Sequence, residues 1–172
     1  RHYDRLLHSE PPIGIHVEVG DWCAQNMLYL AAHASESKPL RLRQLCVVGP
    51  GCASMEHPEL RSRYIKRINE APFQVRIRDF PVTFPAWIHP KEIGINTFGE
   101  QSVGSVFFST IAEYLNPEFD LRSWAPKVRS GGWLGGFGYH VNKGITKAAH
   151  EFANQHRLHL KRDGLVWWVR IK

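Results

Sequence analysis

With 172 residues, 43% of them hydrophobic and 22% charged, the chain has the composition of one folded globular domain, which we expect to span residues 1–172. No apolar run approaches the roughly 18 residues of a membrane-spanning helix, so no membrane insertion is expected. The net charge of +6 favours anionic partners such as RNA or an acidic protein surface, although short scattered groups of basic residues also suit an ordinary solvated surface.

The first half of the chain alternates short apolar runs with amphipathic stretches, which is typical of a sheet covered by helices. Residues 1–12 are polar and end in two prolines, so we expect an extended N-terminal arm. After this arm the pattern predicts a strand at 15–19, a helix that Asp21 caps and that runs through 31, a strand at 45–48, a helix at 58–69 and a strand at 73–78.

The second half continues the alternation and ends in a hairpin. It is predicted to hold a proline-rich loop at 81–90, a strand at 105–108, a helix from Asn116 to the glycines at 131 and 132, a strand at 133–138, a helix at 144–155, and strands at 157–162 and 165–171 around Asp163-Gly164. This order predicts an α/β fold: a doubly wound, Rossmann-like, mostly parallel seven-stranded sheet with an antiparallel C-terminal hairpin strand.

Four segments, in order, carry sequence motifs. Residues 17–24 resemble the pattern E-x-G-x-x-x-G at the end of a first strand, and residues 102–109 resemble the fourth-strand pattern S-x-D-x-V-F-I-D. Tyr114, Asp120 and Trp124 fit the helix that follows, and residues 128–139 resemble an R-P-G-G turn with its strand. Together these segments resemble the class I S-adenosylmethionine (SAM)-dependent methyltransferases, in particular the small-molecule O-methyltransferases, from about residue 13 to the end.

The resemblance implies a SAM site at the carboxyl ends of the strands. Gly20 would let the backbone approach the cofactor, and Glu18 matches the acidic residue that closes the first strand. Trp22 follows the turn and is placed to stack on a ligand. Gly49 stands where a carboxylate normally receives the ribose hydroxyls, and Ser109 ends the fourth strand. These five residues are the candidate cofactor-binding residues.

Catalytic groups are sparse in this sequence. His140 follows the fifth strand and would suit a general base, although an exposed loop histidine is the plainer interpretation. Relatives that use a metal have carboxylates where this chain has Ser109, Phe137 and Gly138, so no catalytic metal is expected. The three cysteines form no C-x-x-C pair, and we expect neither a zinc site nor a disulfide framework.

Two functions fit these residues. The first is a degenerate methyltransferase-like domain that serves as a binding or structural component of a larger assembly, with protein partners or RNA at its basic surface. The second is an active, metal-independent SAM-dependent methyltransferase acting on a small-molecule hydroxyl or amine. For either function we expect a soluble intracellular protein, cytoplasmic or organellar after removal of a targeting sequence.

Overall fold

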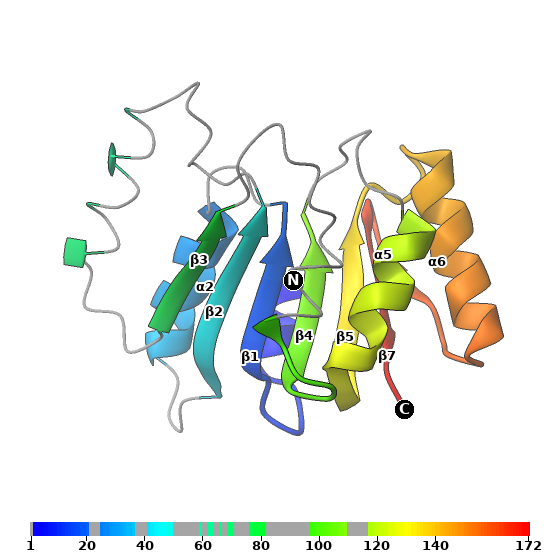
Figure 1. Ribbon diagram of the computed structural model, residues 1–172, viewed down its shortest axis with the longest axis horizontal. Coiled ribbons are helices and arrows are strands. Elements are labelled where there is room, and N and C mark those ends of the chain that lie inside the picture. The colour runs from blue at the N-terminus through cyan, green and yellow to red at the C-terminus, as the bar shows by residue number, and fades with distance from the viewer. Residues whose placement is uncertain are drawn as a thin grey trace.

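The computed structural model describes residues 2–20, 25–36, 41–49, 76–81, 97–109 and 117–172, together with positions 59, 62, 63, 66, 69 and 70. One twisted sheet separates two helical layers, with α2 on one face and α5 and α6 on the other (Figure 1). Among the described residues, no helix has the length and apolar character needed to cross a membrane.

The sheet has seven strands in the order β3-β2-β1-β4-β5-β7-β6. Their bounds are β1 Gly14–Val19, β2 Leu42–Gly49, β3 Arg76–Pro81, β4 Val103–Phe108, β5 Val128–Phe137, β6 Lys161–Asp163 and β7 Val166–Arg170. The first five run parallel to one another, while β7 is antiparallel to both β5 and β6. The expected mostly parallel sheet with an antiparallel C-terminal hairpin strand is therefore confirmed.

The helices follow from their caps and apolar stripes. Their bounds are α1 His2–Leu7, α2 Gln25–Glu36, α5 Pro117–Trp124 and α6 Lys143–Gln155, with a 3₁₀ turn, η2, at Ala125–Lys127. The side chain of Asn142 caps α6 by accepting hydrogen bonds from the amides of Gly144 and Ile145. The buried residues of α6 include Ala148, Ala149 and Phe152, whose helical spacing places them on the face toward the sheet.

The core consists of two apolar clusters that lie on opposite faces of the sheet. Because side chains alternate along a strand, β1 sends Val17 and Val19 to the cluster beneath α5 and α6. The other cluster joins Leu6 and Leu7 of α1 to residues of α2 and β2. On β1, the residues that point toward α1 are polar, and they form the centre of the candidate site.

Several expected elements differ from the structure. The strand expected at 157–162 is confined to Lys161–Asp163, and the helix expected to reach the glycines at 131 and 132 ends at Trp124. Residues 2–7 form the helix α1 instead of an extended arm, because Leu6 and Leu7 gain a buried apolar cluster to pack against. The fifth strand begins at Val128 instead of residue 133. Its Gly132 lies inside the strand, where a Cβ would come within 2.7 Å of the Gly104 carbonyl oxygen, so this glycine permits close strand packing and does not end the helix.

Some sequence predictions fall outside the described residues. The helix at 58–69 is described only at isolated positions, which are helical. The proline-rich loop at 81–90 is described only at Pro81, which ends β3. Residues 73–75 of the third predicted strand, and Trp22, also lie outside the described part.

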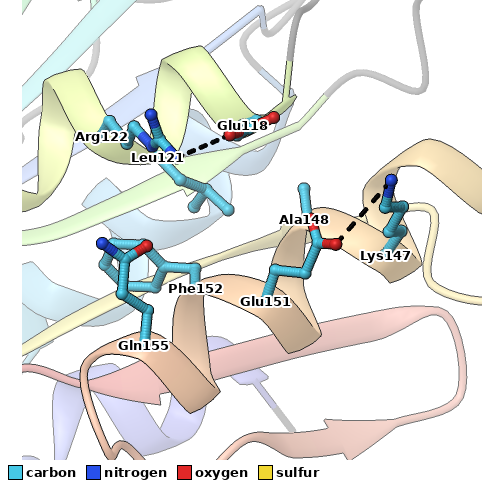
Figure 2. Close-up of a pocket in the computed structure, with 8 residues that line it drawn as sticks. All are labelled: Glu118, Leu121, Arg122, Lys147, Ala148, Glu151, Phe152 and Gln155. Carbon is cyan, nitrogen blue, oxygen red and sulfur yellow. Dashed lines mark ion pairs between the residues drawn. The ribbon is translucent and has the colours of Figure 1, made fainter.

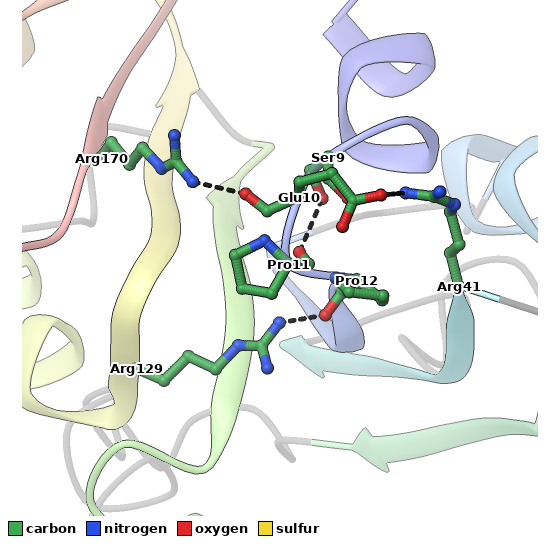
Figure 3. Close-up of polar contacts among 7 residues, drawn as sticks. All are labelled: Ser9, Glu10, Pro11, Pro12, Arg41, Arg129 and Arg170. Atoms are coloured by element: carbon green, nitrogen blue, oxygen red, sulfur yellow. Dashed lines mark hydrogen bonds and ion pairs between the residues drawn. The ribbon is translucent and has the colours of Figure 1, made fainter.

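Three arginines hold the segment that joins α1 to β1 (Figure 3). Arg41 donates hydrogen bonds to the Ser9 carbonyl oxygen at 3.0 Å and to Oε1 of Glu10 at 2.5 Å. Arg170 donates to the Glu10 carbonyl oxygen at 2.5 Å, and Arg129 donates to the Pro12 carbonyl oxygen. These contacts from β2, β5 and β7 fix where α1 lies against the sheet.

The chain just after this segment passes closely over β4. A Cβ on Gly104 would collide with the backbone carbonyl group of Ile13. Only glycine therefore fits at position 104 while the segment before β1 keeps its path. This packing gives a structural reason for the absence of a carboxylate where the fourth-strand motif has Asp.

Candidate functional site

The carboxyl ends of β1, β2 and β4 meet beside one turn. The amide of Gly20 donates a hydrogen bond to the Val48 carbonyl oxygen at 2.7 Å, and the amide of Ser109 donates to the Val19 carbonyl oxygen at 2.9 Å. Gly20 has a φ of 82°, a left-handed conformation that favours glycine. Four of the five candidate cofactor-binding residues therefore lie at or next to the carboxyl ends of these strands. They are Glu18, Gly20, Gly49 and Ser109.

Glu18 lies at the centre of a buried polar network. The hydroxyl of Tyr3 donates a hydrogen bond to its Oε1 at 2.9 Å, and Nε2 of His16 lies 3.0 Å from the same oxygen. The hydroxyl of Ser109 donates to Oε2. The other ring nitrogen of His16, Nδ1, lies 2.6 Å from Oγ of Ser105. Both oxygens of Glu18 are thus engaged by side chains from α1, β1 and the end of β4.

Burial controls the protonation of this network. Glu18 is 0% exposed, and burial raises the pKa of its carboxyl group to about 8, an effect that the hydrogen bond from Tyr3 opposes. His16 is 1% exposed, and burial lowers the pKa of its imidazole to about 3. At neutral pH the imidazole is therefore uncharged, and the carboxyl group holds its proton more strongly than an exposed glutamate does.

These properties affect whether SAM could bind at the carboxyl ends of β1, β2 and β4. Gly20, at the end of β1, has the left-handed backbone that favours glycine. However, the carboxyl group of Glu18 is buried and already engaged, and β2 ends in Gly49, which has no side chain to accept ribose hydroxyls. At the carboxyl ends of β1 and β2, Glu18 is therefore buried and engaged, and Gly49 has no side chain that could accept a hydrogen bond.

His140 lies apart from the Glu18 network, in the turn between β5 and α6. It is exposed and has a φ of 69°. Its amide donates a hydrogen bond to Oγ1 of Thr146 at 3.0 Å, and its ring packs edge-on against Tyr139. Its Nε2 lies 3.5 Å from a guanidinium nitrogen of Arg162. These contacts match the plainer interpretation of an exposed loop residue, while its role as a general base stays a prediction.

Asp120 is a buried carboxyl group whose setting the sequence did not reveal. It is 1% exposed, and neither of its oxygens has a hydrogen-bond partner among the described residues. It lies with Phe108, Phe137 and Trp167 around a small cavity of about 20 Å³ beneath α5. Burial raises the pKa of this group to about 7. The available signal was its place in α5 directly beside the inward-facing Leu121.

The outer surface of α5 and α6 forms a groove of about 380 Å³ (Figure 2). Its floor includes Leu121, Ala148 and Phe152. Its rim carries two ion pairs, Glu118–Arg122 at 2.7 Å and Lys147–Glu151 at 3.7 Å, each between residues one turn apart on the same helix. Because every rim charge is matched within its own helix, this groove offers a binding partner no unpaired charge.

The described residues contain no group of three or more His, Cys, Asp or Glu side chains that could hold a metal ion. Ser109, Phe137 and Gly138 occupy the positions after β4 and at the end of β5 where carboxylates would be needed. The expectation of no catalytic metal stays a prediction.

Solved structures resemble this chain, although no protein-family model and no curated protein sequence matches it. A methyltransferase from Geobacter sulfurreducens is 11% identical and aligns over 99% of this chain and 76% of its own, with a TM-score of 0.62. CalS11, a TDP-rhamnose 3′-O-methyltransferase of calicheamicin biosynthesis, is 11% identical over 98% of this chain and 75% of its own, with a TM-score of 0.63.

A third structure was solved with a cofactor product. SMU.1697c, a putative methyltransferase from Streptococcus mutans in complex with S-adenosylhomocysteine (SAH), is 11% identical over 98% of this chain and 93% of its own, with a TM-score of 0.61. At such identities the likeness establishes the fold alone. The fold of this chain is that of the class I SAM-dependent methyltransferases, and the resemblance inferred from its sequence is confirmed at that level.

Proposed function

We propose that this methyltransferase-like domain serves as a binding or structural component of a larger assembly and not as a catalyst. The observation that carries the proposal is the occupation of both oxygens of Glu18 by Tyr3, His16 and Ser109. A carboxyl group that is engaged at both oxygens and 0% exposed has to be uncovered before it can accept a hydrogen bond from a cofactor. The network then stabilises the packing of α1 on the sheet.

The end of β2 supports the same conclusion. Gly49 has no acceptor for the ribose hydroxyls, and each missing hydrogen bond to a charged acceptor weakens binding by about 1.5–3 kcal/mol. That energy corresponds to a factor of roughly ten to a hundred in the dissociation constant. Two weakened contacts at one edge would move SAM affinity out of the range that a cofactor-dependent enzyme needs.

The alternative is an active, metal-independent methyltransferase acting on a small hydroxyl or amine. The observation that favours it is the intact turn at Gly20, whose amide is bound to the Val48 carbonyl oxygen. SMU.1697c has the same fold and was solved with SAH. Methyl transfer requires mainly a correct approach of acceptor to cofactor, with modest help from a base such as His140.

Calorimetric titration with SAM and SAH separates the two functions. We expect the wild-type chain to bind neither with a dissociation constant below about 100 μM, which corresponds to roughly 5.5 kcal/mol. Gly49→Asp should strengthen binding by at least about ten-fold, because it restores a charged acceptor at the end of β2. Gly49→Asn is the matched control, with similar size and no charge, and should gain less.

Wild-type binding tighter than this limit, with formation of SAH from SAM in the presence of a hydroxyl or amine acceptor, would overturn the proposal and establish the enzyme. Absence of binding in the wild-type chain agrees with the proposal, whereas a Gly49→Asp variant that gains no affinity over Gly49→Asn would contradict the role given to Gly49. The fold of every variant is checked by circular dichroism before the titration.

A further inference from the structure

The small cavity beside Asp120 lies between the sheet and the first turns of α5 and α6. Its volume is about 20 Å³. Most of the side chains that line it are wholly apolar: Phe108, Pro117, Leu121, Phe137 and Ile145. The other two lining residues, Asp120 and Trp167, each carry a polar group. The cavity therefore combines an apolar wall with one carboxyl group and one indole.

Both of these polar groups are buried without a partner. Asp120 is 1% exposed and Trp167 is 2% exposed. Within the described part of the chain, neither the carboxyl oxygens of Asp120 nor Nε1 of Trp167 has a hydrogen-bond partner. Burial of such groups is unfavourable unless each one is hydrogen-bonded. An ionised carboxyl group only accepts hydrogen bonds and an indole N–H only donates them, so the cavity contains one unmet acceptor and one unmet donor.

The indole of Trp167 is held next to the cavity by the strand pairing. Gly136 pairs with Phe108 on one side and with Trp167 on the other. A Cβ on Gly136 would lie 3.0 Å from the Cβ of Phe108 and 3.4 Å from Cζ2 of Trp167, which is on the same side of the ring as the nitrogen. The missing side chain at position 136 therefore leaves room for the nitrogen-bearing side of the indole near Phe108, which lines the cavity.

We propose that this cavity binds one water molecule, which accepts a hydrogen bond from the indole N–H of Trp167 and donates one to the carboxyl group of Asp120. A cavity needs about 10–15 Å³ to hold a water, and the water needs at least two polar partners. The volume and the two unmet groups meet both conditions. An ammonium ion would suit the carboxyl group alone, because it has no lone pair to accept from the indole. The water joins α5 to β7.

This water site is independent of the other proposals on the molecule. One water occupies only one of roughly four acceptor positions of a carboxylate, so burial still raises the pKa of Asp120. Neither Glu18 nor Gly49 lines the cavity. Water binding therefore does not depend on the outcome of the SAM titration.

Nuclear magnetic resonance of the isotope-labelled wild-type chain tests the water directly. The indole N–H resonance of Trp167 is assigned by its disappearance in Trp167→Phe. At pH 8, we expect a cross-peak between this proton and water that has opposite signs in laboratory-frame and rotating-frame Overhauser spectra, as a bound water gives and hydrogen exchange does not. Asp120 is mostly ionised at this pH, and the remaining lining side chains have no exchangeable proton to relay the signal. Absence of the cross-peak in the wild-type chain would overturn the proposal.

Two variants at Asp120 test whether the carboxyl group holds the water. Asp120→Leu replaces it with an apolar group of similar size, and the cross-peak should be lost because a cavity without enough polar partners stays dry. Asp120→Asn is the matched control, since it keeps the size and one acceptor oxygen, and it should retain the cross-peak. A cross-peak that persists in Asp120→Leu would show that the water does not need the carboxyl group, and the proposal would be wrong.

A high-resolution crystal structure of the wild-type chain keeps the proposal testable if Asp120→Leu does not fold. We expect one ordered water within about 3 Å of both Nε1 of Trp167 and a carboxyl oxygen of Asp120. A direct hydrogen bond between these two side chains, or an apolar side chain in the cavity, would overturn the proposal.

Discussion

Two buried carboxyl groups lie on opposite faces of the sheet and differ in their hydrogen bonding. Glu18, on the face of α1, has hydrogen-bonding partners at both oxygens, whereas Asp120, on the inner side of α5, has none among the residues that the structure describes. Burial raises the pKa of both groups, to about 8 and about 7. The comparison teaches that burial sets the direction of a pKa shift, while hydrogen-bonding partners decide whether the group also stabilises the fold.

Glu18→Ala tests the partnered side of this comparison and should have the largest effect. It leaves the hydroxyls of Tyr3 and Ser109 and the Nε2 of His16 around a cavity, so we expect the free energy of unfolding in urea to fall by roughly 3–5 kcal/mol. Glu18→Gln keeps the shape and one acceptor oxygen and should cost less than half as much. Equal stability of the alanine variant and wild type would mean that the network does not form in solution.

Asp120→Asn tests the unpartnered side. The folded-state pKa of Asp120 is raised, so its contribution to stability is fully present below 3.8 and is lost as pH rises through about 7. The free energy of unfolding of the variant, relative to that of wild type, should therefore rise between these pH values. Above about pH 7 the variant should be the more stable protein by more than about 1 kcal/mol. Urea unfolding from pH 4 to pH 8.5 measures this difference, and a difference independent of pH would show that Asp120 has a partner in solution.

Tyr3→Phe removes a single donor from Glu18 and keeps the aromatic ring. We expect the free energy of unfolding to fall by about 1 kcal/mol, the contribution of one hydrogen bond. Tyr29→Phe is the matched control, because this tyrosine packs near Tyr3 but is 46% exposed. The two variants are compared by urea unfolding at pH 7, and a larger loss in Tyr29→Phe would contradict the assigned role of Tyr3.

Arg122→Gln should have the smallest effect on stability. It extends the comparison to an exposed carboxylate, that of Glu118. Its partner Glu118 lies on α5 two residues before Asp120, yet both members of this pair are more than half exposed. Water screens such a pair, so the free energy of unfolding should change by less than about 0.5 kcal/mol. A change above 1 kcal/mol in thermal or urea unfolding would show that the groove surface of α5 contributes more than its exposure implies.

The sequence was a good guide where local signals agree with the tertiary fold. The apolar spacing of α6 predicted its bounds closely, and the Asp163-Gly164 signal predicted the hairpin and its second strand, although the first strand is only Lys161–Asp163. The sequence was a poor guide at α1, because six residues are too few to form a stable helix without packing. It also failed at the start of β5, where glycines that permit close contact between strands were interpreted as a helix end.

The candidate site could be predicted only in part. A glutamate within an apolar strand was expected to need partners, and Glu18 has them. However, Tyr3 lies 15 residues away along the chain and Ser109 lies 91 residues away, so local patterns could not identify them. The missing acceptor at Gly49 was visible in the sequence, since it depends on residue type alone. For Asp120, the sequence offered only its place beside the inward-facing Leu121. Its lack of partners among the described residues depends on how α5 packs against the sheet.

The contact of Ile13 with Gly104 distinguishes two of the positions that lack a motif carboxylate, Gly104 and Gly49, by how easily each could accommodate one. At Gly49, one substitution can supply an acidic side chain, and binding measurements can show its effect. At Gly104, any larger residue meets the Ile13 carbonyl group, so an aspartate there requires the preceding backbone, with its arginine contacts, to be rebuilt as well. A carboxylate at position 49 therefore requires one substitution, whereas a carboxylate at position 104 also requires a different backbone path before β1.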